Sequence, residues 1–171
     1  GLILDAETAY KNALKINPDY CNAYRNLGIL NELQGANEKA KFYYEKVLEL
    51  NSSDAYCYNQ LGNFLKEKGN FEKAISHYKT ALELDDTCVD AYCGLAALKR
   101  YSEKDEDFFR QLNFSVARDI FKPNEKIRLH FALGKVNDDC GLYDEAFEHY
   151  KIGNTLKREL IDYNYDAHES N

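Results

Sequence analysis

The chain has 171 residues, of which 44% are hydrophobic and 13% aromatic, and this apolar content argues against a disordered tail. Its 22 Lys and Arg residues against 29 Asp and Glu residues give a formal net charge of −7, which has the wrong sign for sequence-independent binding to nucleic acid or to an anionic membrane surface. Its five cysteines form no Cys-x-x-Cys pair, so we expect reduced thiols and a cytoplasmic location without a zinc ribbon or a disulfide framework.

Two prolines, nine glycines and 30% charged residues are typical of helices with solvated outer faces. Capping residues and proline divide the chain at Asn17-Pro18, at 51–54, at 85–87 and at Lys122-Pro123. We therefore predict an all-α chain without strands. The predicted helices, in chain order, span residues 3–16, 21–34, 37–50, 55–68, 71–84, 88–101, 105–117, 124–140 and 143–160. No apolar run is long enough to cross a membrane, and residues 1–20 lack a signal-peptide pattern.

The strongest pattern in the sequence is a repeat of 34 residues. A shift of this length aligns the following segments: Tyr24-x-x-Leu27-Gly28, Tyr58-x-x-Leu61-Gly62 and Tyr92-x-x-Leu95-Ala96, and likewise Ala40, Tyr44 and Val47 with Ala74, Tyr78 and Ala81. A small residue at position 8, Ala at 20 and an aromatic residue at 24 resemble the tetratricopeptide repeat (TPR) family. The resemblance implies a right-handed superhelix of helical hairpins (an α-α solenoid), with Gly35, Gly69 and Gly141 in the turn between the two helices, A and B, of a repeat.

The repeat divides residues 1–160 into one array. We predict a half repeat at 1–20, full repeats at 21–54, 55–88, 89–122 and 127–160, and a C-terminal tail or linker at 161–171. The third repeat is irregular, because 38 residues separate Val89 from Ile127 and its second helix lacks the expected small and aromatic residues. Either a bend or a drifting loop accounts for this. The half repeat lacks helix A, so its apolar face is expected to meet another repeat, a partner or a second copy of the chain.

A narrower resemblance lies in the last repeat. Residues 128–135, 143–150 and 153–158 resemble the final repeat of bacterial TPR proteins that carry a C-terminal sulfotransferase domain. The Gly-x-Pro-Arg-Ser-Gly-Thr loop of that catalytic domain does not occur in this sequence. The resemblance implies that the chain is the TPR arm of a larger sulfotransferase-type enzyme. The alternative explanation is that these residues are common to the packing of all TPRs. The leading Gly1 and the absence of methionine suggest a piece of a longer polypeptide.

Catalysis within the chain is not expected. Four histidines, His77, His130, His149 and His168, are the candidate acid-base residues or metal ligands, and none belongs to a His-x-x-x-His pair, a nucleophile elbow or a P-loop. His130 takes the large-residue position 4 of its repeat and His149 precedes the packing aromatic Tyr150, so we interpret both as structural or rim residues. We predict no enzyme activity, no cofactor and no metal.

Binding of a protein or peptide partner is better supported. In the TPR family, positions 2, 5, 9 and 12 of helix A face the concave surface, and here they form a stripe with five basic and three acidic residues. This positive excess favours an acidic or carboxylate-bearing peptide, although it disappears when the residues at position 13 are included. A solvated surface without a ligand is the alternative. Position 6 adds Asn26, because the TPR arms of O-linked N-acetylglucosamine transferases use asparagine there; Gly94 and Ala132 depart from that pattern. The predicted groove residues are Arg25, Asn26, Asn59, Asn63, Lys66, Arg100, Arg128 and Lys135.

Overall fold

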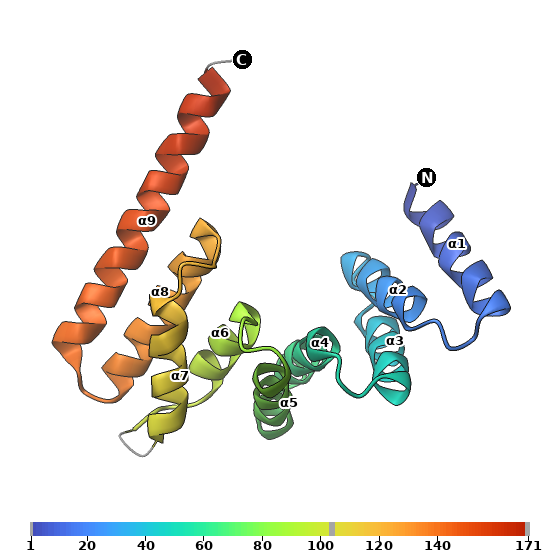
Figure 1. Cartoon of the computed structure of the whole chain (residues 1–171), viewed down its shortest axis with the longest axis horizontal. Coiled ribbons are helices and arrows are strands. Elements are labelled where there is room, and N and C mark those ends of the chain that lie inside the picture. Colours follow the sequence, from blue (N-terminus) through green and yellow to red (C-terminus); the bar gives the residue numbers. More distant parts are fainter. Residues whose placement is uncertain (1, 103–104, 170–171) are drawn as a thin grey trace. The chain divides into compact units, whose positions relative to one another are not determined.

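The computed structural model describes residues 2–102 and 105–169, and within these ranges it contains nine helices and no strand (Figure 1). The helices are α1 (Leu2–Ile16), α2 (Cys21–Leu33), α3 (Asn37–Leu50), α4 (Ala55–Glu67), α5 (Phe71–Leu84), α6 (Val89–Leu98), α7 (Glu106–Ala117), α8 (Pro123–Asp139) and α9 (Tyr143–Glu169). The predicted all-α class is confirmed. The largest differences are that α6 ends three residues early and that α9 continues beyond residue 160 into the predicted tail.

The turns and helix ends follow from local chemistry. Gly35, Gly69 and Gly141 have φ angles of 71°, 74° and 77°, a region that disfavours side chains, and each lies in an A–B turn as predicted. Asp54 caps α4, since its Oδ1 accepts a hydrogen bond from the Cys57 amide at 3.0 Å. Pro123 begins α8, where its missing N–H is not needed.

The contacts divide the chain into two compact units, unit 1 (Gly1–Cys88) and unit 2 (Val89–Asn171). The boundary coincides with the predicted junction between the second and third repeats. The division into an array up to residue 160 and a tail stays a prediction, and residues 170 and 171 of that tail lie outside the described residues.

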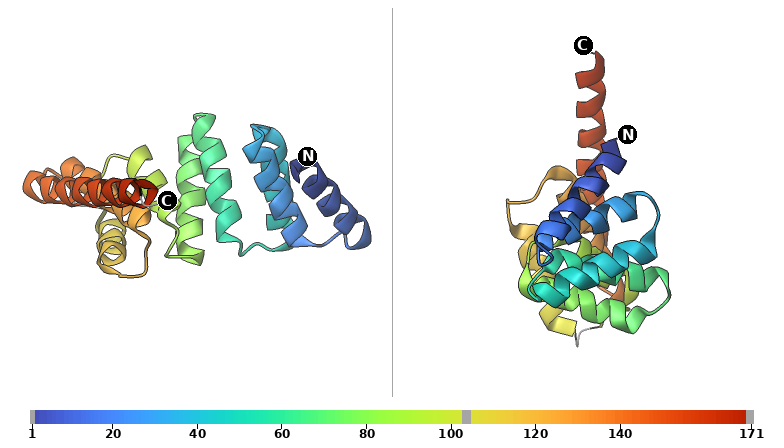
Figure 2. Two further views of the ribbon diagram at one scale, coloured as in Figure 1. Left: turned by 90° about the horizontal axis from the view of Figure 1, so that it is seen from above. Right: turned by 90° about the vertical axis from the view of Figure 1, so that its right-hand side faces the viewer.

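In unit 1, α2 pairs closely with α3 and α4 with α5 (Figure 2). The pairing depends on a glycine that faces a tyrosine ring: a Cβ atom added to Gly62 would lie 2.7 Å from Cε1 of the fully buried Tyr78. Gly28 faces Tyr44 in the same way. Helix α1 packs on α2 but has no buried residue, and Leu2 and Ile16 are 90% and 87% exposed.

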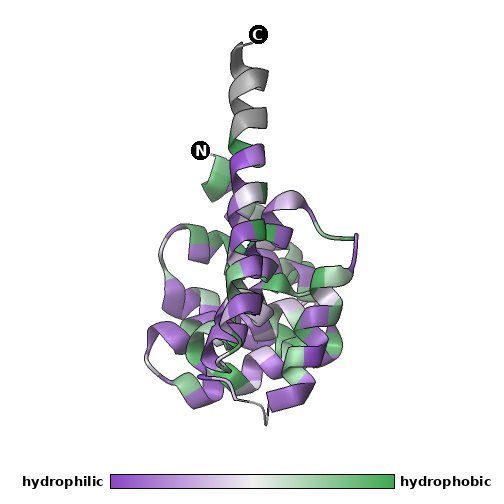
Figure 3. Cartoon of the chain, turned by 90° about the vertical axis from the view of Figure 1, so that its left-hand side faces the viewer, coloured by the Kyte–Doolittle hydropathy of each residue, from purple (hydrophilic) through white to green (hydrophobic). Residues whose placement is uncertain are grey.

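In unit 2, the α8–α9 pair repeats this packing, because a Cβ on Gly134 would lie 2.8 Å from Cδ1 of Tyr150. Figure 3 colours much of the described part of α9 as hydrophilic, although Tyr143, Phe147 and Ile161 of this helix are exposed. Helices α6 and α7 depart from the pattern: both pack on α8, and they meet each other through side chains. Ser115 Oγ donates a hydrogen bond to the Tyr92 hydroxyl at 3.0 Å. The irregularity predicted for the third repeat is thus a change in how its two helices pair.

Candidate peptide-binding face

A chain of polar side chains joins the two repeats of unit 1 on the surface formed by α2 and α4. The Gln60 Nε2 group donates to both carboxylate oxygens of Glu32, at 2.9 and 2.7 Å, and the Tyr44 hydroxyl donates to Glu32 Oε2 at 2.7 Å. Gln60 Oε1 accepts from Asn63 Nδ2 at 3.2 Å, and Asn63 Oδ1 accepts from the Tyr78 hydroxyl at 2.7 Å. We call Tyr44, Glu32, Gln60, Asn63 and Tyr78 the amide network.

The amide network is anchored by the same tyrosines that pack against the repeat glycines. Burial raises the pKa of the Tyr44 phenol, and its hydrogen bond to Glu32 raises it further, so the hydroxyl remains a donor at neutral pH. Because each tyrosine ring lies in the core and its hydroxyl reaches the network, the positions of the surface amides follow from the packing of the helix pairs.

Part of the amide network borders a small cavity. The cavity measures about 50 Å³, and on its far side Asn37 Nδ2 donates to Glu67 Oε2 at 3.2 Å. Lys41 Nζ lies 5.5 Å from the centre of the Phe64 ring, which provides an apolar wall. The lining residues are Glu32, Asn37, Ala40, Lys41, Tyr44, Gln60, Asn63, Phe64 and Glu67.

The predicted groove residues of unit 1 differ in their accessibility. Asn63 and Lys66 are partly exposed, and so is Asn26. Asn59, in contrast, is only 2% exposed and donates to Gln60 Oε1 at 3.0 Å, so its placement on the groove surface was wrong. Arg25 forms an ion pair with the buried carboxylate of Asp54, and the hydrogen bond to Asp54 raises the pKa of the guanidinium against the effect of burial.

The predicted cations of unit 2 are also engaged. Arg128 forms an ion pair with Asp90 at 2.5 Å, and Lys135 Nζ contacts Asp139 at 2.5 Å. Lys135 also donates to the backbone carbonyl of Lys99 at 2.6 Å. Arg100 is exposed but lies after the end of α6, so it does not occupy the helical position expected for it.

These ion pairs weaken the charge argument made from sequence. Three of the predicted groove cations, Arg25, Arg128 and Lys135, have an acidic partner within their own unit. A positive stripe attracts an acidic peptide only where its charges are not already balanced. Lys66 makes no ion pair within the described part of unit 1, so it is the predicted groove cation of this unit whose charge is available to an acidic peptide.

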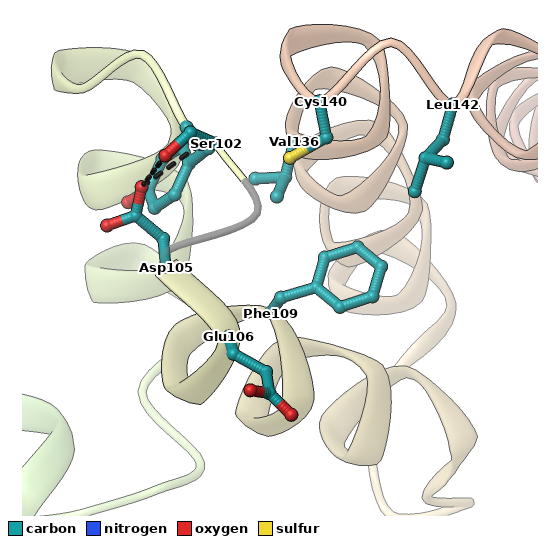
Figure 4. Close-up of a pocket in the computed structure, with 8 residues that line it drawn as sticks. Ser102, Asp105, Glu106, Phe109, Val136, Cys140 and Leu142 are labelled. Atoms are coloured by element: carbon teal, nitrogen blue, oxygen red, sulfur yellow. Dashed lines mark hydrogen bonds between the residues drawn. The ribbon is translucent and has the colours of Figure 1, made fainter.

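Sequence analysis missed an apolar pocket in unit 2, shown in Figure 4. The pocket holds about 170 Å³ between the start of α7 and the end of α8, and the carboxylate of Asp105 at its edge accepts a hydrogen bond from the Ser102 amide at 3.0 Å. The 38-residue step of the third repeat was the signal that could have located it. Its lining residues are Tyr101, Ser102, Asp105, Glu106, Phe109, Val136, Cys140 and Leu142.

Within residues 2–102 and 105–169, no group of three or more His, Cys, Asp or Glu side chains is arranged to hold a metal ion. The same residues contain no helix that is long and apolar enough to cross a membrane. The side chain of His168 lies outside the described residues. His77, in unit 1, has its Nδ1 atom 2.9 Å from the Lys73 carbonyl oxygen.

Comparisons with known proteins agree with the packing described above. Three family profiles match: the tetratricopeptide repeat at residues 55–88, a TPR repeat at 5–35 and a second tetratricopeptide repeat at 22–54. No curated protein matches the sequence. The resemblance of residues 128–158 to TPR–sulfotransferase proteins is not tested by these matches and stays a prediction.

Solved structures with the same fold include three proteins of 22% identity or less. MamA is 22% identical, with a TM-score of 0.67 over 91% of this chain and 89% of its own. BtubC from P. vanneervenii is 21% identical, with a TM-score of 0.71 over 94% and 75%. YrrB, described as a TPR protein with an unusual peptide-binding site, is 19% identical, with a TM-score of 0.55 over 88% and 84%. The repeat profiles over residues 5–88, the glycine–tyrosine helix pairs and these folds together show an all-α solenoid built of tetratricopeptide repeats, a repeat type that supports a protein-interaction scaffold.

Proposed function

We propose that this scaffold binds an extended peptide segment of a partner protein on the α2–α4 surface of unit 1. The observation that carries the proposal is the amide network, which borders the small cavity and keeps its polar groups at fixed positions. Amide side chains both donate and accept, so Gln60 and Asn63 can exchange their mutual hydrogen bonds for bonds to a peptide backbone. A network held by buried tyrosines loses little conformational entropy on binding.

Two further features suggest what the peptide presents. Phe64 and the aliphatic part of Lys41 line the cavity, which has room for a small apolar side chain. Lys66 lies on the same helix, three residues beyond Asn63, and offers a charge to a carboxylate of the peptide. Asn26 remains in the proposal as a secondary contact, whereas Arg100, Arg128 and Lys135 stay a separate prediction for unit 2 by itself. Asn59 does not remain in the proposal, because it is buried.

The test begins with selection of peptides from a displayed library on the purified chain, followed by calorimetric titration of the best binder. We expect Asn63→Ala/Lys66→Ala to weaken binding at least about tenfold, since it removes one amide and one charge. The matched control is Asn12→Ala/Lys79→Ala, which changes the same residue types on the exposed surfaces of α1 and α5. Equal affinity of the wild type and the Asn63/Lys66 variant would show that peptides bind elsewhere.

The resemblance in residues 128–158 supports a second role, as the N-terminal arm of a sulfotransferase-type enzyme. In this role the scaffold presents a substrate or partner to a catalytic domain that the sequence given does not contain. Reading the coding sequence downstream of Asn171 for a Pro-Arg-Ser-Gly-Thr-like loop tests it directly. Self-association through α1 is the third proposal, and light scattering at high protein concentration distinguishes a monomer from a dimer.

A further inference from the structure

His130 on α8 and His149 on α9 face each other across the last helix pair. Their Nδ1 atoms are 3.1 Å apart, their ring centres are 5.3 Å apart and the ring planes differ by 35°. Both side chains are partly buried. We propose that these two Nδ1 atoms form a binding site for a divalent transition-metal ion of the Zn²⁺ or Ni²⁺ type, in place of the purely structural role expected from the sequence.

The distance between the two nitrogens suits a shared metal ion. Imidazole nitrogen binds Zn²⁺ at about 2.0–2.1 Å, so two nitrogens 3.1 Å apart subtend an angle of about 98° at the ion. This angle lies between the octahedral and tetrahedral values. The separation of the two nitrogens therefore matches a zinc-like ion shared by both rings.

Two earlier repeats pack a pair of rings at the same two positions, and of the full repeats only the last fills both positions with histidine. The equivalent pairs are Tyr24 with Tyr43, at 6.4 Å between ring centres, and Tyr58 with His77, at 5.8 Å. The Nδ1 atom of His77 points to the Lys73 carbonyl instead of its ring partner. In the last repeat, the equivalent positions thus bring two imidazole nitrogens within 3.1 Å of each other.

The protonation state also suits a metal ion. Burial lowers the pKa of both imidazoles, and the neighbouring His149 lowers that of His130 further, so both rings are neutral at pH 7 and have a lone pair available. Without a metal, one ring donates a hydrogen bond to the other. No third protein ligand is arranged around the pair among the described residues, so water or a ligand from a partner completes the coordination.

The site is tested with Zn²⁺ and, separately, Ni²⁺ as probes, in calorimetric titrations of the whole chain at pH 7. We expect one equivalent to bind and the imidazole NMR signals of His130 and His149 to shift while those of His77 do not. His130→Tyr and His149→Tyr, which restore residue types found at these positions in other repeats, should weaken binding at least about tenfold. Lowering the pH to 5.5 should also weaken it, because protons compete for the nitrogens.

The matched control is His77→Tyr, the same substitution at the equivalent position of an earlier repeat, which should leave the affinity unchanged. Circular dichroism melts without metal establish that each variant is folded. A saturating metal should raise the melting temperature of the wild type by about 3 °C and that of His130→Tyr not at all. Absence of one-equivalent binding overturns the proposal, and so does binding that survives His130→Tyr, as it would if the cysteines held the metal. An equal loss in His77→Tyr also overturns it.

Discussion

Substitution of Gly62 by alanine tests whether the close approach of glycine and tyrosine holds the helix pairs together. The added Cβ would lie 2.7 and 2.8 Å from two ring carbons of Tyr78 and 3.2 Å from a third. That ring is fully buried, and its hydroxyl donates to Asn63 at 2.7 Å, so it has little freedom to move aside. Overpacking of this kind costs about 1–3 kcal/mol. The better helix propensity of alanine returns about 1 kcal/mol.

We therefore expect Gly62→Ala to lower the free energy of unfolding by up to about 2 kcal/mol, measured by urea denaturation followed by circular dichroism. Gly153→Ala is the matched control, because its Cβ would meet the Phe131 ring at 3.4 Å, an ordinary contact. It should stabilise unit 2 by up to about 1 kcal/mol. If Gly62→Ala raises the unfolding free energy as Gly153→Ala is expected to, glycine at position 8 is not required by packing and the argument fails.

A compensating substitution sharpens the test. In the third repeat, Ala96 stands at position 8 and the fully buried Leu112 at position 24, so that repeat combines a larger residue on helix A with a smaller one on helix B. The double variant Gly62→Ala/Tyr78→Leu copies this combination. The double variant should lose less unfolding free energy than the two single variants lose together, because leucine removes the ring that the new methyl group meets.

Three other predictions follow from single features. Gly69→Ala, at φ +74° with open space around it, should lower the unfolding free energy by about 1 kcal/mol through backbone strain alone, measured by urea denaturation. Burial raises the pKa of Cys57, so iodoacetamide should alkylate it far more slowly than the partly exposed Cys21, as followed by mass spectrometry. The pKa values of His130 and His149 are lowered in the folded chain, so the unfolded chain binds protons more readily. Without metal, the free energy of unfolding should be constant above about pH 6.5 and fall below it. Acid denaturation curves of His130→Tyr should show a smaller fall.

The fold could be predicted because its determinants recur at a fixed spacing. Glycine at position 8 and tyrosine at position 24 both come from the same repeat, so one 34-residue window contains the whole contact. The early end of α6 has a different origin. Tyr101 N–H donates to Asp139 at 3.0 Å, and the buried Tyr101 ring stacks on Phe108 at 4.8 Å. These contacts join segments of different helices, and no periodic pattern in the sequence announces them.

The site was harder to predict for a related reason. Helical position alone assigned Arg25 to the groove, but its partner Asp54, at the end of the same repeat and the start of α4, is 29 residues away and becomes its neighbour only when the chain folds. Asn59 likewise takes a groove position of its helix, yet it is only 2% exposed and donates to Gln60 Oε1. A family position predicts which way a side chain starts from the backbone. It does not predict whether another part of the folded chain already binds or buries that side chain.

This double use of side chains decides which variant reports on binding. Asn63 is part of the proposed peptide surface, yet its Oδ1 also accepts the hydrogen bond of the buried Tyr78, so its removal lowers stability by about 1 kcal/mol whether or not a peptide binds. Lys66 makes no ion pair within the described part of unit 1, and its truncation leaves the amide network intact. Lys66→Ala alone should therefore weaken the selected peptide without a change in the urea midpoint. A loss of stability equal to that of Asn63→Ala would mean that the surface is a structural seam between repeats and not a surface kept for a ligand.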